Sequence, residues 1–271
     1  MNRTANFEGF RSDINILRAI AVSLVVLYHS DIPIFKSGFV GVDIFFVISG
    51  FLMADIVVTG AERQTFSLLE FYRARFRRVY PGLVFLLIFV LIYGFIYFPN
   101  IVYRELVDEV TASLLFLSNL KYSSTVDYFE FVVDQNWLIH TWSLSVEAQF
   151  YALFPLVTLS VLRITNSKAT QQIIFVVLIS ASFVFMLLYR QNYPVETFYS
   201  LPARAWEFLF GSLAFLLSRD YELSLILRKF IFLIGALIIV YSLAFSNLNS
   251  WPTHKTIYPV FGVALILLCN F

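Results

Sequence analysis

The sequence predicts an all-α protein, a polytopic transmembrane helical bundle with about eight spans in a single integral-membrane domain over residues 1–271. Composition carries this prediction first: 59% of the 271 residues are hydrophobic and only 14% are charged, against about 25% in soluble domains. The mean hydropathy is +0.79, and apolar runs long enough to cross a bilayer recur along the chain. These observations exclude a soluble globular domain.

Charge and cysteine content exclude further classes. A net charge of +1 offers no basic surface for a nucleic acid, and the lone Cys269 leaves neither a disulfide nor a thiolate metal site. The chain also lacks zinc-ligand spacing, a glycine-rich phosphate loop and a G-x-S-x-G nucleophile turn. We therefore expect no metal and no bound cofactor.

Apolar stretches predict the spans in order. The predicted helices cover residues 14–30, 39–58, 81–98, 140–162, 172–189, 203–218, 229–246 and 257–271. Residues 59–80 are predicted to form a basic loop. The longest stretch without a clear span is 99–139, and its apolar part, 110–120, is too short to cross alone. We interpret 110–120 as a re-entrant or short, tilted segment.

Topology depends on whether 110–120 crosses. If it does not, and the N-terminus is cytoplasmic, twelve Lys and Arg residues lie inside and five lie outside. If it does, the split becomes ten to seven. Because inside loops are enriched in Lys and Arg, the first arrangement is favoured.

The first predicted helix carries Arg18 and His29 in an apolar run. They are eleven residues apart, three turns plus roughly 20°, so they share a face about 16 Å apart. An arginine at the centre of a span costs about 2.5–3.5 kcal/mol. We therefore expect the pair to face a buried polar site.

The predicted helix 140–162 carries a polar stripe. His140, Ser143, Glu147 and Tyr151 follow spacings of three, four and four, so they share one helical face. Such a stripe faces protein or water rather than lipid. It serves either as a helix–helix contact, worth about 1 kcal/mol per bond, or as a reactive site with the histidine of the first helix.

Four arginines, Arg73, Arg75, Arg77 and Arg78, stand at a predicted membrane boundary. A cytoplasmic loop with topology-setting charge, or with anionic headgroups as partners, explains such a block. The alternative is a phosphate-bearing donor substrate, since the planar guanidinium binds phosphates bidentately.

Three more charged residues fall in apolar segments. Asp43 lies near the start of the second helix, where it either bonds a neighbouring helix end or orients His29. Arg204 and Glu207 are three residues apart, so they can neutralise each other as a structural ion pair lining the cavity.

Taken together, these blocks resemble the acyltransferase-3 family of multi-spanning membrane O-acyltransferases, which acylate hydroxyls of bacterial cell-surface glycans. The similar blocks are RSDINILRAIAVSLVVLYH, GFVGVDIFFVISGFLM, FYRARFRRVYP, HTWSLSVEAQFYALFP and PARAWEFLFGSL, in order over residues 11–213. Two positions depart from the family pattern: Asn15-Ile16 replaces the usual Asp-Gly, and Ala74 interrupts the arginine block.

The resemblance implies about ten helices in the full family fold, in the bacterial inner membrane with a cytoplasmic N-terminus. It implies acetyl-CoA or another acyl-CoA as co-substrate, and a glycan acceptor such as lipopolysaccharide O-antigen, exopolysaccharide or peptidoglycan. By this resemblance His29 is catalytic and forms an essential pair with Arg18. Arg75 and Arg78 bind the donor, with Arg73 beside them. Glu147 also belongs to the site. His29 would act as general base or relay the acyl group, and Glu147 would hold its tautomer or act as its acid/base partner.

Two alternatives stay open. Buried charges such as Arg18 and Glu147 also suit a transporter or flippase of a small anion or glycan lipid, although a transporter does not need the arginine block. The chain ends inside the apolar run 262–271, where the family continues with two more helices. We therefore expect a truncated chain, with an inactive remnant as the second alternative.

Overall fold

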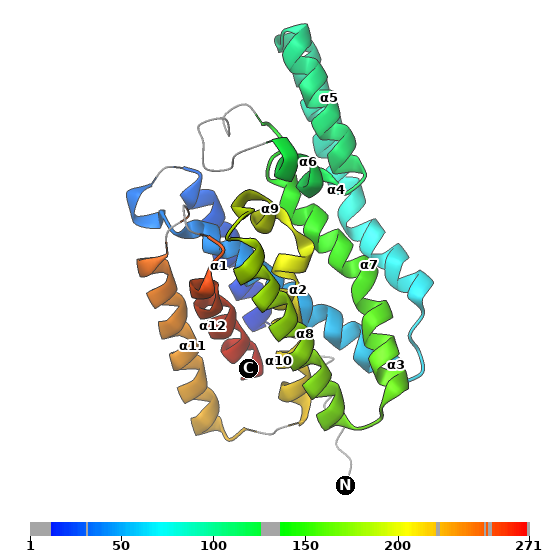
Figure 1. The fold of residues 1–271 in the computed structure, drawn as a ribbon, viewed down its shortest axis with the longest axis vertical. Coiled ribbons are helices and arrows are strands. Elements are labelled where there is room, and N and C mark those ends of the chain that lie inside the picture. Colours follow the sequence, from blue (N-terminus) through cyan, green and yellow to red (C-terminus); the bar gives the residue numbers. More distant parts are fainter. Residues whose placement is uncertain are drawn as a thin grey trace.

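The computed structural model describes residues 12–30, 32–125, 136–220, 223–246, 248 and 251–269, and these contain helices but no β-strand. Figure 1 shows the long helices side by side in one bundle. The helices are α1 (Ser12–Tyr28), α2 (Gly41–Ala54), α3 (Gly60–Glu62), α4 (Leu68–Tyr97), α5 (Asn100–Leu114), α6 (Ser118–Thr125), α7 (Thr141–Ile164), α8 (Lys168–Tyr189), α9 (Pro194–Tyr199), α10 (Leu201–Asp220), α11 (Leu225–Phe245) and α12 (Ile257–Leu268). The all-α prediction is confirmed.

Within the described residues, five helical segments are long and apolar enough to cross a membrane. They are Gly38–Glu62, Leu68–Tyr97, Thr141–Ile164, Lys168–Tyr189 and Leu225–Phe245. The first is continuous because the π-helical turn Asp55–Thr59 joins α2 to α3. α1, α10 and α12 lie among them, and each of the eight predicted ranges overlaps one of these helices. The chain is an integral membrane protein.

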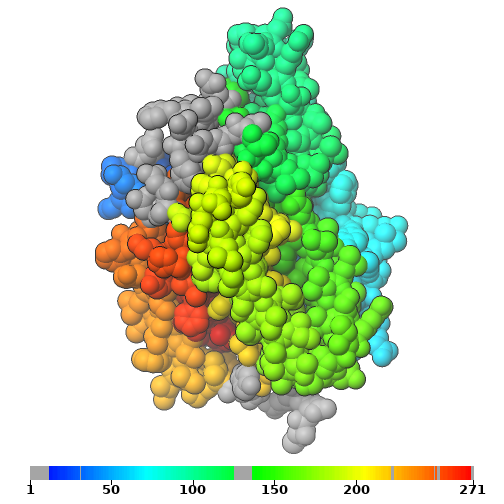
Figure 2. Space-filling view, in the orientation of Figure 1, coloured from blue at the N-terminus to red at the C-terminus, as the bar shows by residue number. Residues whose placement is uncertain are grey.

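The bundle is organised around α2. In the most apolar window of its segment 61% of residues are buried, against 11–17% for α4, α8 and α11. The last three expose large aliphatic and aromatic side chains, as lipid-facing helices do. In the space-filling view α8 covers the middle of the visible face, with α7 on one side and α11 and α12 on the other (Figure 2). Site residues on α2 are therefore shielded from lipid.

Two glycines let α2 and α10 approach closely. A Cβ on Gly50 would lie 1.8 Å from the Phe208 carbonyl oxygen, and one on Gly211 would lie 1.9 Å from that of Val47. The Ser212 hydroxyl donates to the Gly50 carbonyl at 2.9 Å. Small residues at crossings are typical of membrane bundles, and this crossing sets the distance between charged groups on the two helices.

The predicted basic loop at 59–80 is wrong over most of its length. α4 begins at Leu68 and continues through the arginine block to Tyr97, with Pro81 in its interior. Ser67 caps it by accepting from the Glu70 N–H at 3.4 Å. The helix predicted over 81–98 therefore starts thirteen residues too late, at a proline that lies inside α4. The arginines therefore stand on a rigid helix and not on a loop.

The stretch after α4 does not cross the bundle. It forms α5 and α6, separated at Leu115–Leu117, where Phe116 has φ 55°. The Trp137 ring, just before α7, lies 4.8 Å from that of Phe98 at the end of α4. α4 therefore ends where α7 begins, at the end of the bundle from which α5 projects in Figure 1. This is the arrangement that the charge distribution favoured.

Ion pairs join the loops at the opposite end. Arg219 at the end of α10 pairs with Glu62 of α3 at 2.6 Å. Lys168 at the start of α8 pairs with Asp220 at 2.5 Å. The charge count had assigned the segments around α3, the start of α8 and the end of α10 to the same side of the membrane, and the structure brings them into contact.

Candidate functional site

The polar stripe of α7 lines a row of cavities. Glu147 accepts hydrogen bonds from Ser49 of α2 and, at 2.5 Å, from the Tyr151 hydroxyl one turn further along α7. Tyr151 also lies 3.3 Å from the Ser49 hydroxyl. Glu147 and Tyr151 were predicted to share a face, and the structure brings them into contact. Ser49 belongs to this group as well, although its place in an apolar run gave little sign of it.

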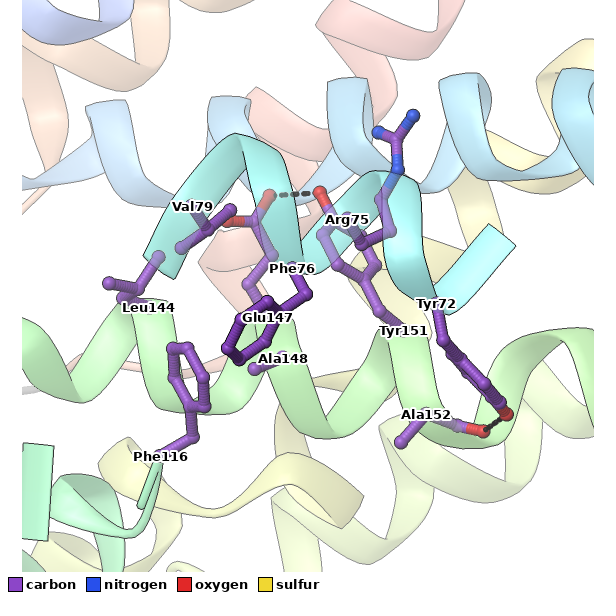
Figure 3. A pocket seen from close by; sticks show the side chains of 10 residues that line it. All are labelled: Tyr72, Arg75, Phe76, Val79, Phe116, Leu144, Glu147, Ala148, Tyr151 and Ala152. Carbon is purple, nitrogen blue, oxygen red and sulfur yellow. Dashed lines mark hydrogen bonds between the residues drawn. The ribbon is translucent and has the colours of Figure 1, made fainter. Parts of the chain in front are cut away.

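The first cavity, which we call the arginine cavity, lies between α4 and α7. It has a volume of about 170 Å³, and its walls include Tyr72, Arg75, Phe76, Glu147 and Tyr151. In Figure 3 Arg75 rises from α4 beside the Glu147–Tyr151 hydrogen bond, and its guanidinium points away from that bond. The Arg75 Nε is buried without a hydrogen-bond partner in the described chain. The arginine cavity is thus lined by the cation Arg75 on one side and by Glu147 and Tyr151 of the α7 stripe on the other.

The other predicted cations lie at different places around Arg75. Arg18 of α1 and Arg78 are near enough for their charges to act on Arg75. Arg73 is exposed and pairs with Glu70 at 2.7 Å, so it does not line the arginine cavity. Arg77 is exposed. Of the arginine block, Arg75 is the member that lines the arginine cavity.

The second cavity, which we call the histidine cavity, lies towards the end of the bundle where α7 begins. It has a volume of about 60 Å³ and is lined by residues that include His29, His140, Ser143 and Arg204. The rings of His29 and His140 are 4.3 Å apart, edge to face.

A third cavity of about 110 Å³ lies between the other two and is called the middle cavity here. It shares Glu147 with the arginine cavity, and Val42 and Ser143 with the histidine cavity. Phe45 and Phe46 form the rest of its α2 wall. The three cavities therefore adjoin in a row along α7, from Arg75 to His29.

The structure does not place Glu147 beside His29, as its predicted role would need. Glu147 lines the arginine and middle cavities, whereas His29 lines the histidine cavity. His140, which does meet His29, is seven residues before Glu147, a rise of about 10 Å along α7. Helical periodicity places residues on one face but spreads them along the axis. The neighbour of His29 on α7 is therefore His140.

Behind the histidine cavity lies a buried charge cluster. Arg204 pairs with Asp43 at 2.5 Å and with Glu207 at 3.1 Å, and these three side chains are at most 1% exposed. Trp251 donates from its indole N–H to Asp43 at 3.2 Å. The predicted Arg204–Glu207 pair is therefore present. The suggestion that Asp43 orients His29 is wrong, because Asp43 is engaged by Arg204 and Trp251.

A second polar stripe of α7 was missed. Thr141, Ser145 and Gln149 bond Ser113 (2.8 Å), Ser118 (2.7 Å) and Asn119 (2.8 Å) of α5 and α6. Their spacing of four was the available signal. This stripe anchors α7 against α5 and α6, which leaves the 143/147/151 stripe for the cavities.

Glu109 of α5 fixes the entry to α7. Its carboxylate accepts from the Leu138 N–H at 3.0 Å. Burial raises the pKa of Glu109 above its ordinary value, against the opposing effect of that N–H.

No metal-binding group of three His, Cys, Asp or Glu side chains occurs within the described residues.

Comparison with known proteins identifies the family of the chain. A model of the acyltransferase-3 family, described as an acyltransferase domain, matches residues 11–271. The peptidoglycan O-acetyltransferase OatA of Listeria monocytogenes is 34% identical over 221 residues, 79% of this chain and 35% of that protein. The O-acetyltransferase OatA of Staphylococcus aureus strain NCTC 8325 is 32% identical over 264 residues, 93% of this chain and 43% of that protein.

A protein of Haemophilus influenzae without a described function is 32% identical over 237 residues, 84% of this chain and 94% of its own length. The chain thus spans less than half of either OatA relative. No solved structure matches it significantly.

Proposed function

The chain belongs to the acyltransferase-3 family, and on that premise we propose that it moves an acyl group, acetyl in the first instance, from acyl-CoA to a hydroxyl of a cell-surface glycan. The row of three adjoining cavities between Arg75 and His29 carries this proposal. It offers a route from a cationic donor end to an acceptor end where the imidazoles of His29 and His140 are exposed. The names of the two OatA relatives support O-acetylation as the reaction.

The donor enters at the arginine cavity in this proposal. Arg75 lines it, with Arg78 and Arg18 near enough to add positive charge. Guanidinium groups suit the phosphates of CoA, because they bind them with paired donors. The apolar remainder of the wall suits the uncharged arm that ends in the thioester. Arg73 pairs with Glu70, so we assign it to setting the membrane topology or to binding lipid headgroups rather than to binding the donor.

Transfer takes place at the histidine cavity. The acceptor oxygen attacks the acyl carbonyl carbon as its proton passes to an imidazole nitrogen of His29. The carbon–sulfur bond then breaks, and the leaving thiolate takes up the proton. Histidine suits both steps because its ordinary pKa lies near neutrality. His140 assists by packing edge to face against His29, with ring centroids 4.3 Å apart, which holds the imidazole of His29 in place.

Glu147 acts on the route rather than on His29. Its carboxylate ties α2 to α7 through Ser49 and Tyr151, at the junction of the arginine and middle cavities. We propose that it holds this junction at the width that the acyl-bearing arm needs. Ser143 occupies the corresponding junction with the histidine cavity.

The acceptor is proposed to be a glycan or lipid-linked glycan on the outer side of the bacterial inner membrane, with the N-terminus cytoplasmic. Twelve of the Lys and Arg residues then lie inside. Peptidoglycan leads the acceptor classes because one relative carries it in its name. O-antigen and exopolysaccharide are the other classes that the assay covers.

Transfer of labelled acetyl from acetyl-CoA to isolated glycans, measured in membranes that contain the chain, tests this function. His29→Ala is expected to lower the rate at least 100-fold, since general acid–base catalysis contributes that much. His254→Ala is the matched control, because His254 is exposed at the start of a short 3-10 helix and is expected to keep the wild-type rate. Equal product from wild type and His29→Ala would overturn the assignment, and acceptor-independent flux of substrate would favour a transporter.

A further inference from the structure

Arg204 carries a buried donor that the fold leaves unused. Its side chain is 1% exposed, and its Nη1 has no hydrogen-bond partner in the described chain. Leaving a buried donor unpaired costs about 1–3 kcal/mol, and more for a charged group. Native structures rarely keep such a group without a use for it. The Nη1 of Arg204 therefore has no acceptor among the described residues and is available to a bound group.

The rest of the guanidinium is held in place. Nη2 donates a hydrogen bond to Asp43 at 2.5 Å, and Nε lies 3.1 Å from a Glu207 oxygen in an ion pair that lacks hydrogen-bond geometry. The rings of Phe46 and Phe198 lie 5.5 and 5.7 Å from its central carbon. A planar group fixed on two edges presents its third nitrogen in one direction.

Arg204 also lines the histidine cavity. It shares that wall with His29, His140 and Ser143, while Asp43 and Glu207 do not line it. The free nitrogen thus belongs to the one member of the charge cluster that borders the cavity of His29. A group bound at His29 is within the same 60 Å³ space.

The charge of the cluster selects the kind of acceptor. Two carboxylates surround one guanidinium, so the cluster carries no surplus positive charge. A full anion such as a phosphate gains little there, because the carboxylates repel it. A neutral carbonyl oxygen that becomes negative only during the reaction is the better match.

We infer that Arg204 donates from Nη1 to the carbonyl oxygen of the acyl group at His29 and stabilises the negative charge that develops there. The inference rests on the proposed acyl transfer. When the acceptor oxygen forms its bond to the carbonyl carbon, the π electron pair moves to the carbonyl oxygen, which Nη1 then holds. The pair returns as the carbon–sulfur bond breaks, and the thiolate receives the proton kept by His29.

Arg204→Lys tests the inference in the full chain. Lysine keeps the positive charge between the two carboxylates but lacks the third nitrogen of the fork. We expect kcat for acetyl transfer to fall about 100- to 1,000-fold, with KM for acetyl-CoA unchanged. Arg219→Lys is the matched control on the same helix, since Arg219 also pairs with a carboxylate, Glu62. It is expected to keep the wild-type kcat.

An infrared measurement separates this role from a structural one. Acetyl-CoA labelled with carbon-13 at the carbonyl is added to the purified chain without acceptor. We expect a bound carbonyl band below that of free acetyl-CoA in wild type, and its return to the free position in Arg204→Lys. An unshifted wild-type band overturns the inference. An equal kcat in Arg204→Lys and wild type overturns it as well.

A second variant covers the case in which Arg204→Lys does not fold. Asp43→Asn keeps the arginine and removes one neutralising charge, so the carbonyl band is expected to move further from its free position. An unchanged band would contradict the inference. Wild-type membranes that transfer no acetyl at all would instead refute the proposed function, so the two failures are distinguishable.

Discussion

Replacing Gly50 by alanine separates packing from helix propensity at the centre of the bundle. An added Cβ would lie 1.8 Å from the Phe208 carbonyl oxygen, a backbone atom that cannot rotate away. Real Cβ contacts essentially never fall under 3.0 Å. α2 and α10 must therefore move apart by about 1.2 Å or more, the difference between these two distances.

Two effects of opposite sign set the magnitude. Alanine stabilises a helix interior by about 1 kcal/mol relative to glycine. Overpacking a close contact costs about 1–3 kcal/mol, and more where backbone must shift. We expect Gly50→Ala to lose about 1–2 kcal/mol of unfolding free energy on balance. Asp43 on α2 holds Nη2 of Arg204 on α10 across this crossing, so the same movement displaces the guanidinium and the acetyl-transfer rate should fall as well.

Gly82→Ala is the matched control. Gly82 also lies inside a helix, but an added Cβ there meets nothing within 4 Å. Only the higher helix propensity of alanine then affects stability, and we expect the free energy of unfolding to rise by up to about 1 kcal/mol. Thermal unfolding in detergent gives both values. A Gly50→Ala protein as stable as Gly82→Ala would refute the close-packing argument.

Three further changes test other parts of the account. Arg75→Lys is expected to raise KM for acetyl-CoA about tenfold by loss of paired phosphate donors, whereas the exposed Arg77→Lys should leave it unchanged in the same steady-state assay. Tyr151→Phe removes the hydroxyl that bonds Glu147 and should cost about 1 kcal/mol in thermal unfolding; an unchanged melting temperature would contradict this. Burial raises the pKa of Glu109, so its ionised form destabilises the fold as pH rises through that value. Glu109→Gln should therefore melt above wild type at about pH 8 and together with it at about pH 4; a pH-independent difference would count against this reasoning.

Helical periodicity explains which parts of the site could be predicted. It placed Ser143, Glu147 and Tyr151 on one face of α7, where the structure has them lining the row of cavities. It could not predict how far along the helix axis these residues lie from His29. A spacing of three or four residues fixes the direction of a side chain around its own helix but does not show which helix packs against it. The contact between His29 and His140 depends on how α1 packs beside α7.

Ion pairs between residues far apart in the chain could not be predicted from the sequence. Asp43 and Arg204 are 161 residues apart, and the glycines at the α2–α10 crossing bring them together. Trp251 joins them from a short loop whose sequence carries no sign of a buried contact. The start of α4 was misplaced because the apolar stretch begins only after the arginine block, whereas the helix includes that block and continues through Pro81.

The central claim is that the acyl group passes along the row of cavities from Arg75 to His29. Val42 lines both the middle and the histidine cavity, so Val42→Phe places a ring where they join. The control is Val22→Phe, at an exposed position of α1 that faces lipid.

The direct measurement uses sealed, inside-out vesicles that enclose glycan acceptor, with labelled acetyl-CoA added outside. The account predicts labelled glycan inside wild-type and Val22→Phe vesicles, and its loss in Val42→Phe vesicles that still bind acetyl-CoA. Labelled glycan at the wild-type rate in Val42→Phe vesicles would contradict it.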